Sequence, residues 1–313
     1  MPKKLALLGT GLGLVVGAVI GGASTYYYLK PSQTILSTKV STSPVGAVGE
    51  PISKHVVAAK DILHKGFPGP VSDILYRQAY VGSYNRSLRN PNWVAEHLTK
   101  AALDGNGDSP DRSKSTFKED QSIPSPFRAH LQDYSGSGFD RGHLVPAADV
   151  QVSQEAVNET FLLSNISPQV AKAFNRGYWA YFEKFVRDLT KTFDDVYVVT
   201  GPLYLPHKGS DGRFYTTYEV IGNPPNTAVP THFFKVILTY HKGQYAMSGF
   251  VLPNQKIGDP PLDSFLTPVD AIERSTGLVF FPELENKSAL PCICSRTKCA
   301  VTSFKFAAKQ LLE

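Results

Sequence analysis

The sequence predicts an α+β fold with a mostly antiparallel central sheet flanked by helices. β-Branched and aromatic residues gather in short segments that end at proline, glycine or polar turns. The segments expected to be strands are 92–99, 160–167, 195–206, 213–222, 231–240 and 244–254. They follow one another without a repeating strand–helix–strand alternation, which argues against a parallel sheet. Residues 104–126 are polar and are expected to form a loop.

The strongest helix signal lies in residues 175–193. Its apolar side chains recur at steps of three and four residues, so they share one face of a helix: Trp179, Phe182, Val186, Leu189 and Phe193. We expect Trp179 to anchor this helix in the core, because large aromatic side chains are mainly buried. Residues 269–278 and the last residues of the chain, from 303 on, are expected to form shorter helices.

The N-terminal segment is suited to a membrane. Residues 5–29 carry no charge and are flanked by lysines, and about 20 apolar residues span a bilayer. Two interpretations stay open, an uncleaved membrane anchor and a processed leader. Residues 31–64 are rich in Ser, Thr, Val and Pro and are interpreted as a linker. A single domain is therefore expected over residues 65–313, ending in a cysteine-containing tail.

The formal net charge of +5 does not by itself indicate a nucleic-acid partner. Residues 1–50 carry +3 of it, four lysines against one glutamate, which leaves about +2 for the rest. Any basic surface would have to be local.

The three cysteines lie together near the end of the chain, at Cys292, Cys294 and Cys299. Their spacing fits neither a distributed disulfide framework nor a four-ligand zinc site. A local structural or redox feature of the tail is the favoured interpretation, and one disulfide with a free thiol is the alternative.

Residues 138–149, "GFDRGHLVPAAD", contain the ingredients of phosphodiester hydrolysis. That reaction needs a base that works near neutral pH and a cation at the phosphate. His143 suits the first task, and Arg141 adds a positive charge two residues away. Gly142 would let the backbone approach a ligand closely. Asp140 could cap the turn or hold Arg141 through a bidentate pair.

A second segment adds polar residues at helical spacing. Asn175 stands at the expected helix start, and Glu183 follows eight residues later, so both lie along one side of the helix. The Asn175 carbonyl could bind Mg²⁺, which keeps several waters and needs few protein oxygens. Glu183 could hold a metal-bound water or accept from an arginine. An N-cap role for Asn175 and a surface ion pair for Glu183 are the simpler alternatives.

The two segments together, "DRGHLVPAAD" and "SNISPQVAKAFNRGYWAYFE", resemble the DNA/RNA non-specific endonuclease family. The stretches "TGPLYLP", "YEVIGNPP", "AVPTHFFKVIL" and "IERSTGL" resemble its endonuclease G branch, the fungal mitochondrial nucleases in particular. The similarity runs from about residue 66 to about residue 280. It implies a ββα-metal nuclease fold, in which a hairpin carries the histidine and a helix carries the asparagine and the glutamate.

The resemblance also implies roles at matching positions. His143 matches the general base, Asn175 the single protein ligand of Mg²⁺, and Glu183 the acid that binds the metal-bound waters. Arg141 and Asn165 match positions that assist phosphate binding.

Three further positions complete the implied site. Asp140 orders the motif, with Gly142 in support, and Arg112 in the polar loop is the nearest candidate for an upstream arginine that some relatives use. Nine residues separate Asn165 from Asn175, one more than we expect for animal relatives.

The same resemblance implies an endonuclease that cuts DNA and RNA and leaves 5′-phosphate ends, with Mg²⁺ as cofactor and Mn²⁺ as a substitute. It implies a homodimer. With the membrane segment at 5–29, it implies a mitochondrial protein in the inner membrane that faces the intermembrane space. Two other hypotheses stay open: a catalytically idle nucleic-acid or membrane scaffold, and a phosphodiesterase for another phosphate ester.

Overall fold

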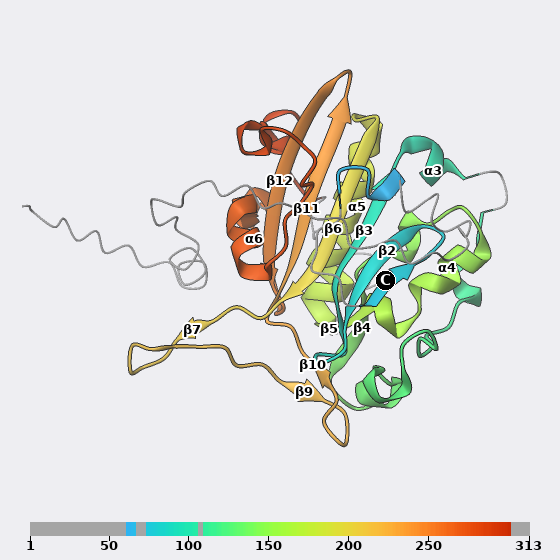
Figure 1. The fold of residues 1–313 in the computed structure, drawn as a ribbon, viewed down its shortest axis with the longest axis vertical. Helices are drawn as coiled ribbons and strands as arrows, with labels where there is room; N and C mark the ends of the chain where they lie inside the picture. The colour runs from blue at the N-terminus through green and yellow to red at the C-terminus, as the bar shows by residue number, and fades with distance from the viewer. Residues whose placement is uncertain (1–60, 67–72, 106–108, 302–313) are drawn as a thin grey trace, which may run out of the picture. The chain divides into compact units, whose positions relative to one another are not determined.

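A seven-stranded antiparallel sheet forms the centre of the molecule in the computed structural model, which describes residues 61–66, 73–105 and 109–301 (Figure 1). All of these residues belong to one compact unit. The strand order is β1-β2-β3-β6-β11-β12-β13. In chain order the strands are β1 (Asp73–Tyr76), β2 (Tyr80–Asn85), β3 (Asn90–Leu98), β6 (Asp195–Leu203), β11 (His232–His241), β12 (Gln244–Pro253) and β13 (Leu266–Thr267).

The sheet is covered on both faces. Helices α4 (Gln154–Thr160) and α5 (Ala180–Asp188) pack on one face, where Phe182 and Trp179 are fully buried against Phe233. Helix α6 (Val269–Thr276) packs on the other face through Ile272. The predicted α+β architecture and the buried position of Trp179 are confirmed.

A small hairpin and a helix stand beside the central sheet. Strand β4 (Phe139–His143) pairs antiparallel with β5 (Ile166–Val170), and His143 lies opposite Ile166. The chain then passes through a kinked helical segment, Ala171–Trp179, into α5. The order β4, β5, α5 is the ββα arrangement that the sequence resemblance implies. The short helical turns are α3 (Lys100–Asp104), Arg112–Lys114, Ser125–Phe127, Leu131–Tyr134, Ala147–Asp149, Leu163–Asn165, Leu189–Lys191, Leu262–Phe265, Lys287–Ala289 and Ile293–Ser295.

Three predicted elements differ from the structure. Residues 160–167 are not one strand: they contain the end of α4, the turn Leu163–Asn165 and the start of β5. The helix predicted over 175–193 is regular only from Ala180, because Arg176 and Gly177 have non-helical backbone angles. Residues 213–222 form no strand of the central sheet.

Instead, that segment belongs to an arm that projects from the body in Figure 1. The arm contains the small hairpin of β7 (His207–Lys208) with β8 (Phe214–Tyr215). At its base β9 (Val220–Ile221) pairs with β10 (Thr227–Ala228), and Ile221, Thr227 and Ala228 are buried. Phe214 is 59% exposed. Residues 213–220 are all exposed, and only Ile221 at the end of the segment is buried, so an aromatic and β-branched pattern here marks extended backbone that is largely unburied.

The predicted domain start is slightly late. Ile62 and Leu63, at the end of the predicted linker, are buried against the α6 face of the sheet. The segment 5–29, most of the linker and the expected C-terminal helix lie outside the described residues. Within the described ranges, no helix has the length and apolar character needed to cross a bilayer.

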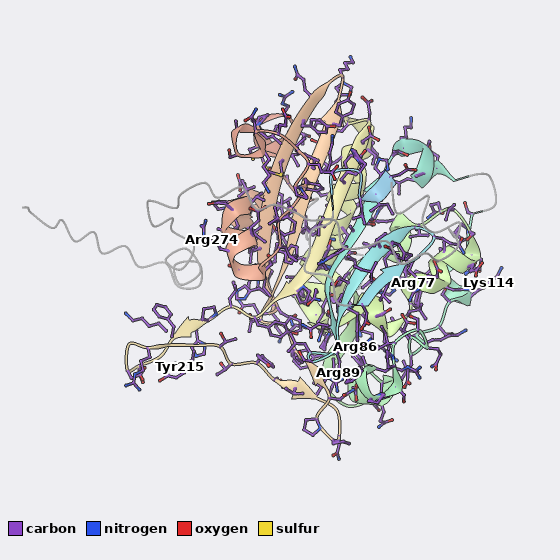
Figure 2. All side chains as sticks on the ribbon, viewed as in Figure 1. Arg77, Arg86, Arg89, Lys114, Tyr215 and Arg274 are labelled. Atoms are coloured by element: carbon purple, nitrogen blue, oxygen red, sulfur yellow. A yellow bond between two sulfur atoms is a disulfide. The ribbon has the colours of Figure 1, made fainter. Side chains whose placement is uncertain are left out.

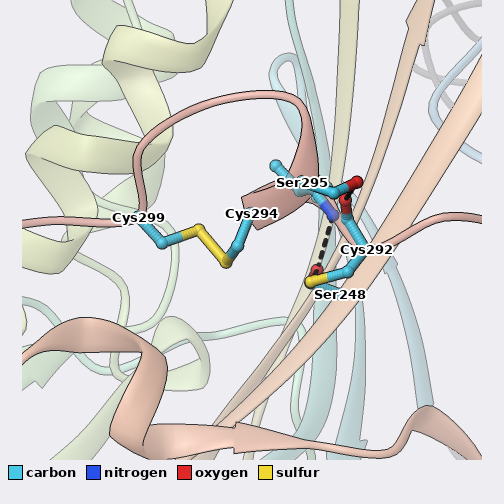
Figure 3. The surroundings of a disulfide bond; sticks show 6 residues. Ser248, Cys292, Cys294, Ser295 and Cys299 are labelled. Atoms are coloured by element: carbon cyan, nitrogen blue, oxygen red, sulfur yellow. Dashed lines mark hydrogen bonds between the residues drawn. A yellow bond between two sulfur atoms is a disulfide. The ribbon is translucent and has the colours of Figure 1, made fainter.

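The cysteine tail contains one disulfide and one free thiol (Figure 3). Cys294 and Cys299 are bonded, and Cys292 lies beside Ser248 of β12 with 3.2 Å between its sulfur and the serine hydroxyl. The structure therefore agrees with the alternative interpretation of the cysteines, one disulfide with a free thiol, and not with the favoured one.

Candidate active site

His143 ends strand β4 and is buried between two aromatic rings. The ring of Phe161 meets it edge-on at 4.7 Å between centroids, and that of Phe117 lies 5.3 Å away. Its Nε2 atom is buried and has no hydrogen-bond partner among the described residues. The imidazole is thus fixed by packing rather than by hydrogen bonds to Nε2.

This environment keeps the imidazole neutral. Burial, with a smaller contribution from the positive charge of Arg112, lowers the pKa of His143 to about 3. A neutral ring has a nitrogen lone pair that can take a proton from water. A phosphate next to the ring would raise the pKa again, because a negative charge stabilises the imidazolium.

Two exposed arginines flank the histidine on the same aromatic rings. The guanidinium of Arg141 lies over Phe117 at 4.8 Å, and that of Arg112 lies over Phe161 at 5.9 Å. Cation–π contacts of this kind hold a positive charge in place without neutralising it. The structure therefore brings the predicted Arg112 and Arg141 to the same site as His143.

Asp140 orders the site differently from the prediction. It does not hold Arg141. Its carboxylate accepts two hydrogen bonds from Arg176, at 2.7 and 2.5 Å, and one from Asn175 Nδ2 at 2.8 Å. Burial alone would raise the pKa of Asp140, but the hydrogen bonds from Arg176 and Asn175 outweigh it and hold the pKa below its usual value. The ionised Asp140 therefore fixes the Asn175 amide, with the carbonyl oxygen turned away from it.

The structure explains the glycine at position 142 differently from the prediction, which was that a ligand approaches the backbone there. A Cβ atom at this position would lie 2.1 Å from Gln169 Oε1, far closer than a real contact. The glycine makes room for the fully buried Gln169 side chain of the partner strand β5. Gly142 thus lets the hairpin close behind His143.

Asn165 is hydrogen-bonded to the backbone that follows His143. It is fully buried, its Oδ1 accepts from the Val145 amide, and its Nδ2 donates to the carbonyl oxygens of Val145 and Thr160, all at 2.8–3.0 Å. These bonds engage both ends of the Asn165 amide, so the help in phosphate binding that the resemblance implies would be indirect. Asn165 instead holds the segment that follows His143.

Glu183 lies on α5 in a charged environment. Burial raises its pKa to about 7; Lys235 opposes this rise, and Asp149 adds to it. Arg112 and Arg187 also lower it. The charge of Arg112 therefore acts on both Glu183 and His143.

Sequence reasoning missed Arg187, Asp149, Phe117 and Phe161. Arg187 donates to Asp149 Oδ1 at 2.5 Å and stays partly exposed. Arg187 follows Glu183 by one helical turn, a spacing that could have identified it. No sequence pattern could have identified the two phenylalanines, because they lie far from His143 in the sequence and contact it only in the folded protein.

Residues 58–287 match the family of DNA/RNA non-specific endonucleases. The chain belongs to this family. A nuclease of Syncephalastrum racemosum is 52% identical over 261 residues, which cover 80% of this chain and 81% of the relative. The mitochondrial nuclease of Saccharomyces cerevisiae is 42% identical over 303 residues, which cover 94% of this chain and 91% of that relative. A chain of the solved EndoG/EndoGI complex aligns with a TM-score of 0.71 and 44% identity, over 78% of this chain and 96% of that one.

Membership confirms the ββα-metal nuclease fold and identifies the chain as a hydrolytic nuclease. Metal dependence is standard for non-specific endonucleases of this family, and the residues fit such an ion. Within the described ranges, no three His, Cys, Asp or Glu side chains gather into a metal cluster. A cation held mainly by water and by one amide oxygen suits that donor set, and the carbonyl oxygen of the fixed Asn175 amide would be the candidate ligand.

Proposed function

We propose that this nuclease is a Mg²⁺-dependent endonuclease that hydrolyses DNA and RNA without sugar preference and leaves 5′-phosphate ends. Mn²⁺ is expected to replace Mg²⁺, because both take oxygen ligands. The observation that carries the proposal is a buried, neutral His143 flanked by two exposed arginines, with the Asn175 amide ordered by the same strand.

Each side chain has a distinct task in the proposal. His143 takes the proton from the attacking water, while Arg141 and Arg112 bind the phosphate and its growing charge. Asn175 would hold the cation through its carbonyl oxygen, and Glu183 would accept hydrogen bonds from water around it. The cation, when bound, supplies charge stabilisation at the phosphate and the leaving oxygen.

A plasmid-nicking assay with and without EDTA tests the activity, with an RNA transcript as the second substrate. We expect His143→Ala to lower the rate by about 10²–10⁴-fold or more, because it removes the base, with an unchanged circular dichroism spectrum. His241→Ala, a partly exposed histidine at the end of β11, is the matched control and should cleave normally. Full activity of a folded His143→Ala protein, or cleavage that EDTA leaves unchanged, would contradict the proposal. Wild-type protein that binds but never cuts would support the idle scaffold.

We also propose a mitochondrial location, which is supported by the mitochondrial nuclease of S. cerevisiae among the relatives. The uncharged segment 5–29 would hold the protein in the inner membrane, facing the intermembrane space. N-terminal sequencing of the mature protein separates an anchor from a processed leader. A homodimer is expected by family resemblance, and light scattering of the purified protein tests it.

A further inference from the structure

Four charged side chains, three of them buried, gather between the central sheet and α5, behind the residues that would contact substrate. Glu96 comes from β3, Lys235 from β11, Asp149 from the turn after His143, and Arg187 from α5. Glu96 is 3% exposed and Lys235 1%. Lys235 donates to Thr200 at 2.8 Å and lies 3.5 Å from the carbonyl oxygen of Leu144, the residue after His143. The cluster therefore touches the catalytic strand from behind.

Three carboxyl oxygens in this cluster receive no hydrogen bond from any described donor. They are both oxygens of Glu96 and Oδ2 of Asp149, and all three are buried. Buried polar atoms without partners are rare and costly. The two carboxyl groups are neighbours: both residues line one pocket, and each side chain shifts the pKa of the other. If Glu96 carries a proton, its carboxyl group becomes a hydrogen-bond donor, and Asp149 Oδ2 can accept from it.

The charge balance agrees with a protonated Glu96. The charged neighbours of Glu96 are the acids Asp149 and Glu183 and the cations Lys235 and Arg187, so an ionised Glu96 would add an unbalanced negative charge to them. Burying an unpaired carboxylate costs several kcal/mol, so such a group takes up a proton instead. Burial raises the pKa of Glu96 well above its usual value; Asp149 and Glu183 raise it further, and Lys235 and Arg187 lower it.

We propose that Glu96 is a positioning residue: as a neutral acid it donates its proton to Asp149 Oδ2 and so fixes the Asp149–Arg187 ion pair beside Glu183. Asp149 Oδ1 binds Arg187, so the two oxygens of one carboxylate connect the buried acid to the active-site arginine. The inference rests on the proposed nuclease function, because its effect is measured on cleavage.

A pocket lies beside Glu96 and Asp149. It has a volume of about 230 Å³, and Glu96 and Asp149 line it together with Gln78, His97 and Asp61. A metal ion is a poor occupant, because these acids already face Lys235 and Arg187. The pocket instead lets Glu96 exchange its proton with bulk water, so the network responds to pH.

Two substitutions at Glu96 separate positioning from packing. In Glu96→Gln the amide donates to Asp149 at every pH, so cleavage near pH 7 should stay within about twofold of wild type, and the ratio of variant to wild-type rate should rise with pH. In Glu96→Leu the donor is lost, and the rate should fall roughly tenfold or more, as for other residues that orient a site from outside. Glu285→Gln, at an exposed glutamate, is the control and should follow the wild-type pH profile.

Parallel pH profiles for wild type and Glu96→Gln, in an active wild-type enzyme, would overturn the proposal and leave the nuclease function standing. A wild type that does not cleave at all would refute the proposed function instead. If Glu96→Leu fails to fold, the comparison of wild type with Glu96→Gln still decides.

Denaturant unfolding supplies a readout that needs no activity. The folded state holds a proton on Glu96 that the unfolded state releases above about pH 4.5. Wild-type stability should therefore fall as pH rises above that value, up to the raised pKa. Glu96→Gln lacks this proton and should gain stability relative to wild type over the same range. A stability difference that does not change with pH would overturn the proposal.

Discussion

At the scale of single residues, the site works by keeping its acid and base in states that exposed side chains would not have. His143 stays neutral because two phenylalanine rings exclude water from it. Glu183 is protonated more easily than a surface glutamate, because α5 packs it against the sheet. Both shifts come from burial, so they depend on the fold rather than on the motif alone.

The raised pKa of Glu183 predicts a pH dependence. Below about pH 7 the side chain is protonated and loses an acceptor for metal-bound water; above it the carboxylate is ionised. We expect kcat/KM to rise with pH through about 7 at fixed low Mg²⁺. Glu183→Gln should be slower, and this rise should be absent from its pH–rate profile. A profile of Glu183→Gln that is parallel to that of wild type would assign the ionisation to another group.

Asn175 predicts an effect on the metal. Asn175→Ala removes the only side-chain oxygen assigned to the cation, so both Mg²⁺ affinity and turnover should fall, roughly 10–100-fold for affinity. Titration of the cleavage rate with Mg²⁺ measures both quantities. Asn286→Ala, at an exposed asparagine, is the control. Unchanged Mg²⁺ affinity in Asn175→Ala would refute its assignment as the ligand.

At the scale of elements, the hairpin of β4 and β5 depends on one glycine. Gly142→Ala would place a methyl group against the buried Gln169, which has little room to move. We expect a loss of about 1–3 kcal/mol in the free energy of unfolding, as for other overpacked sites, and slower cleavage because His143 is displaced.

Denaturant unfolding of Gly142→Ala measures this loss against Gly258→Ala. Gly258 is exposed, and a Cβ there would meet no atom within 4 Å, so its substitution should be nearly neutral. Equal stability of the two variants would show that Gln169 moves aside at no cost.

Sequence patterns predicted the elements whose side chains are buried on regular faces. The strands near 92–99, 195–206, 231–240 and 244–254 and the helix near 269–278 are confirmed. The segment 213–222 has a similar pattern but lies on the arm, because alternation indicates an extended chain and not its partner. Residues 160–167 were misassigned because Asn165 bonds to backbone groups of Val145, a contact that local spacing cannot reveal.

Some residues of the candidate site could likewise be predicted from the sequence, and others could not. His143, Asn175 and Glu183 could be predicted because one short motif and one helix carry them. Phe117 and Glu96 come from distant segments and meet the site only when the sheet and the loop pack. Their contributions to the pKa values of the site therefore could not be predicted from spacing.

At the scale of the whole molecule, nucleic-acid binding is expected to rest on local rather than net charge. The chain carries +5, and much of that lies before residue 50. Arg112 and Arg141 keep their charges exposed beside His143, whereas exposed Arg274 on α6 is paired with Asp270 at 2.8 Å. Figure 2 places Lys114, in the same turn as Arg112, far from Arg274 in the view.

This distribution predicts a salt effect. Binding of a fluorescent DNA duplex should weaken steeply with salt, because each phosphate contact releases counterions. Arg112→Ala, made in a His143→Ala background that prevents cleavage, should bind more weakly and lower the slope of log K against log salt by about 1. Arg274→Ala in the same background should leave the slope unchanged, because α6 packs on the opposite face of the sheet. Equal slopes for the Arg112 and Arg274 variants would mean that net charge, rather than the arginines beside His143, determines binding.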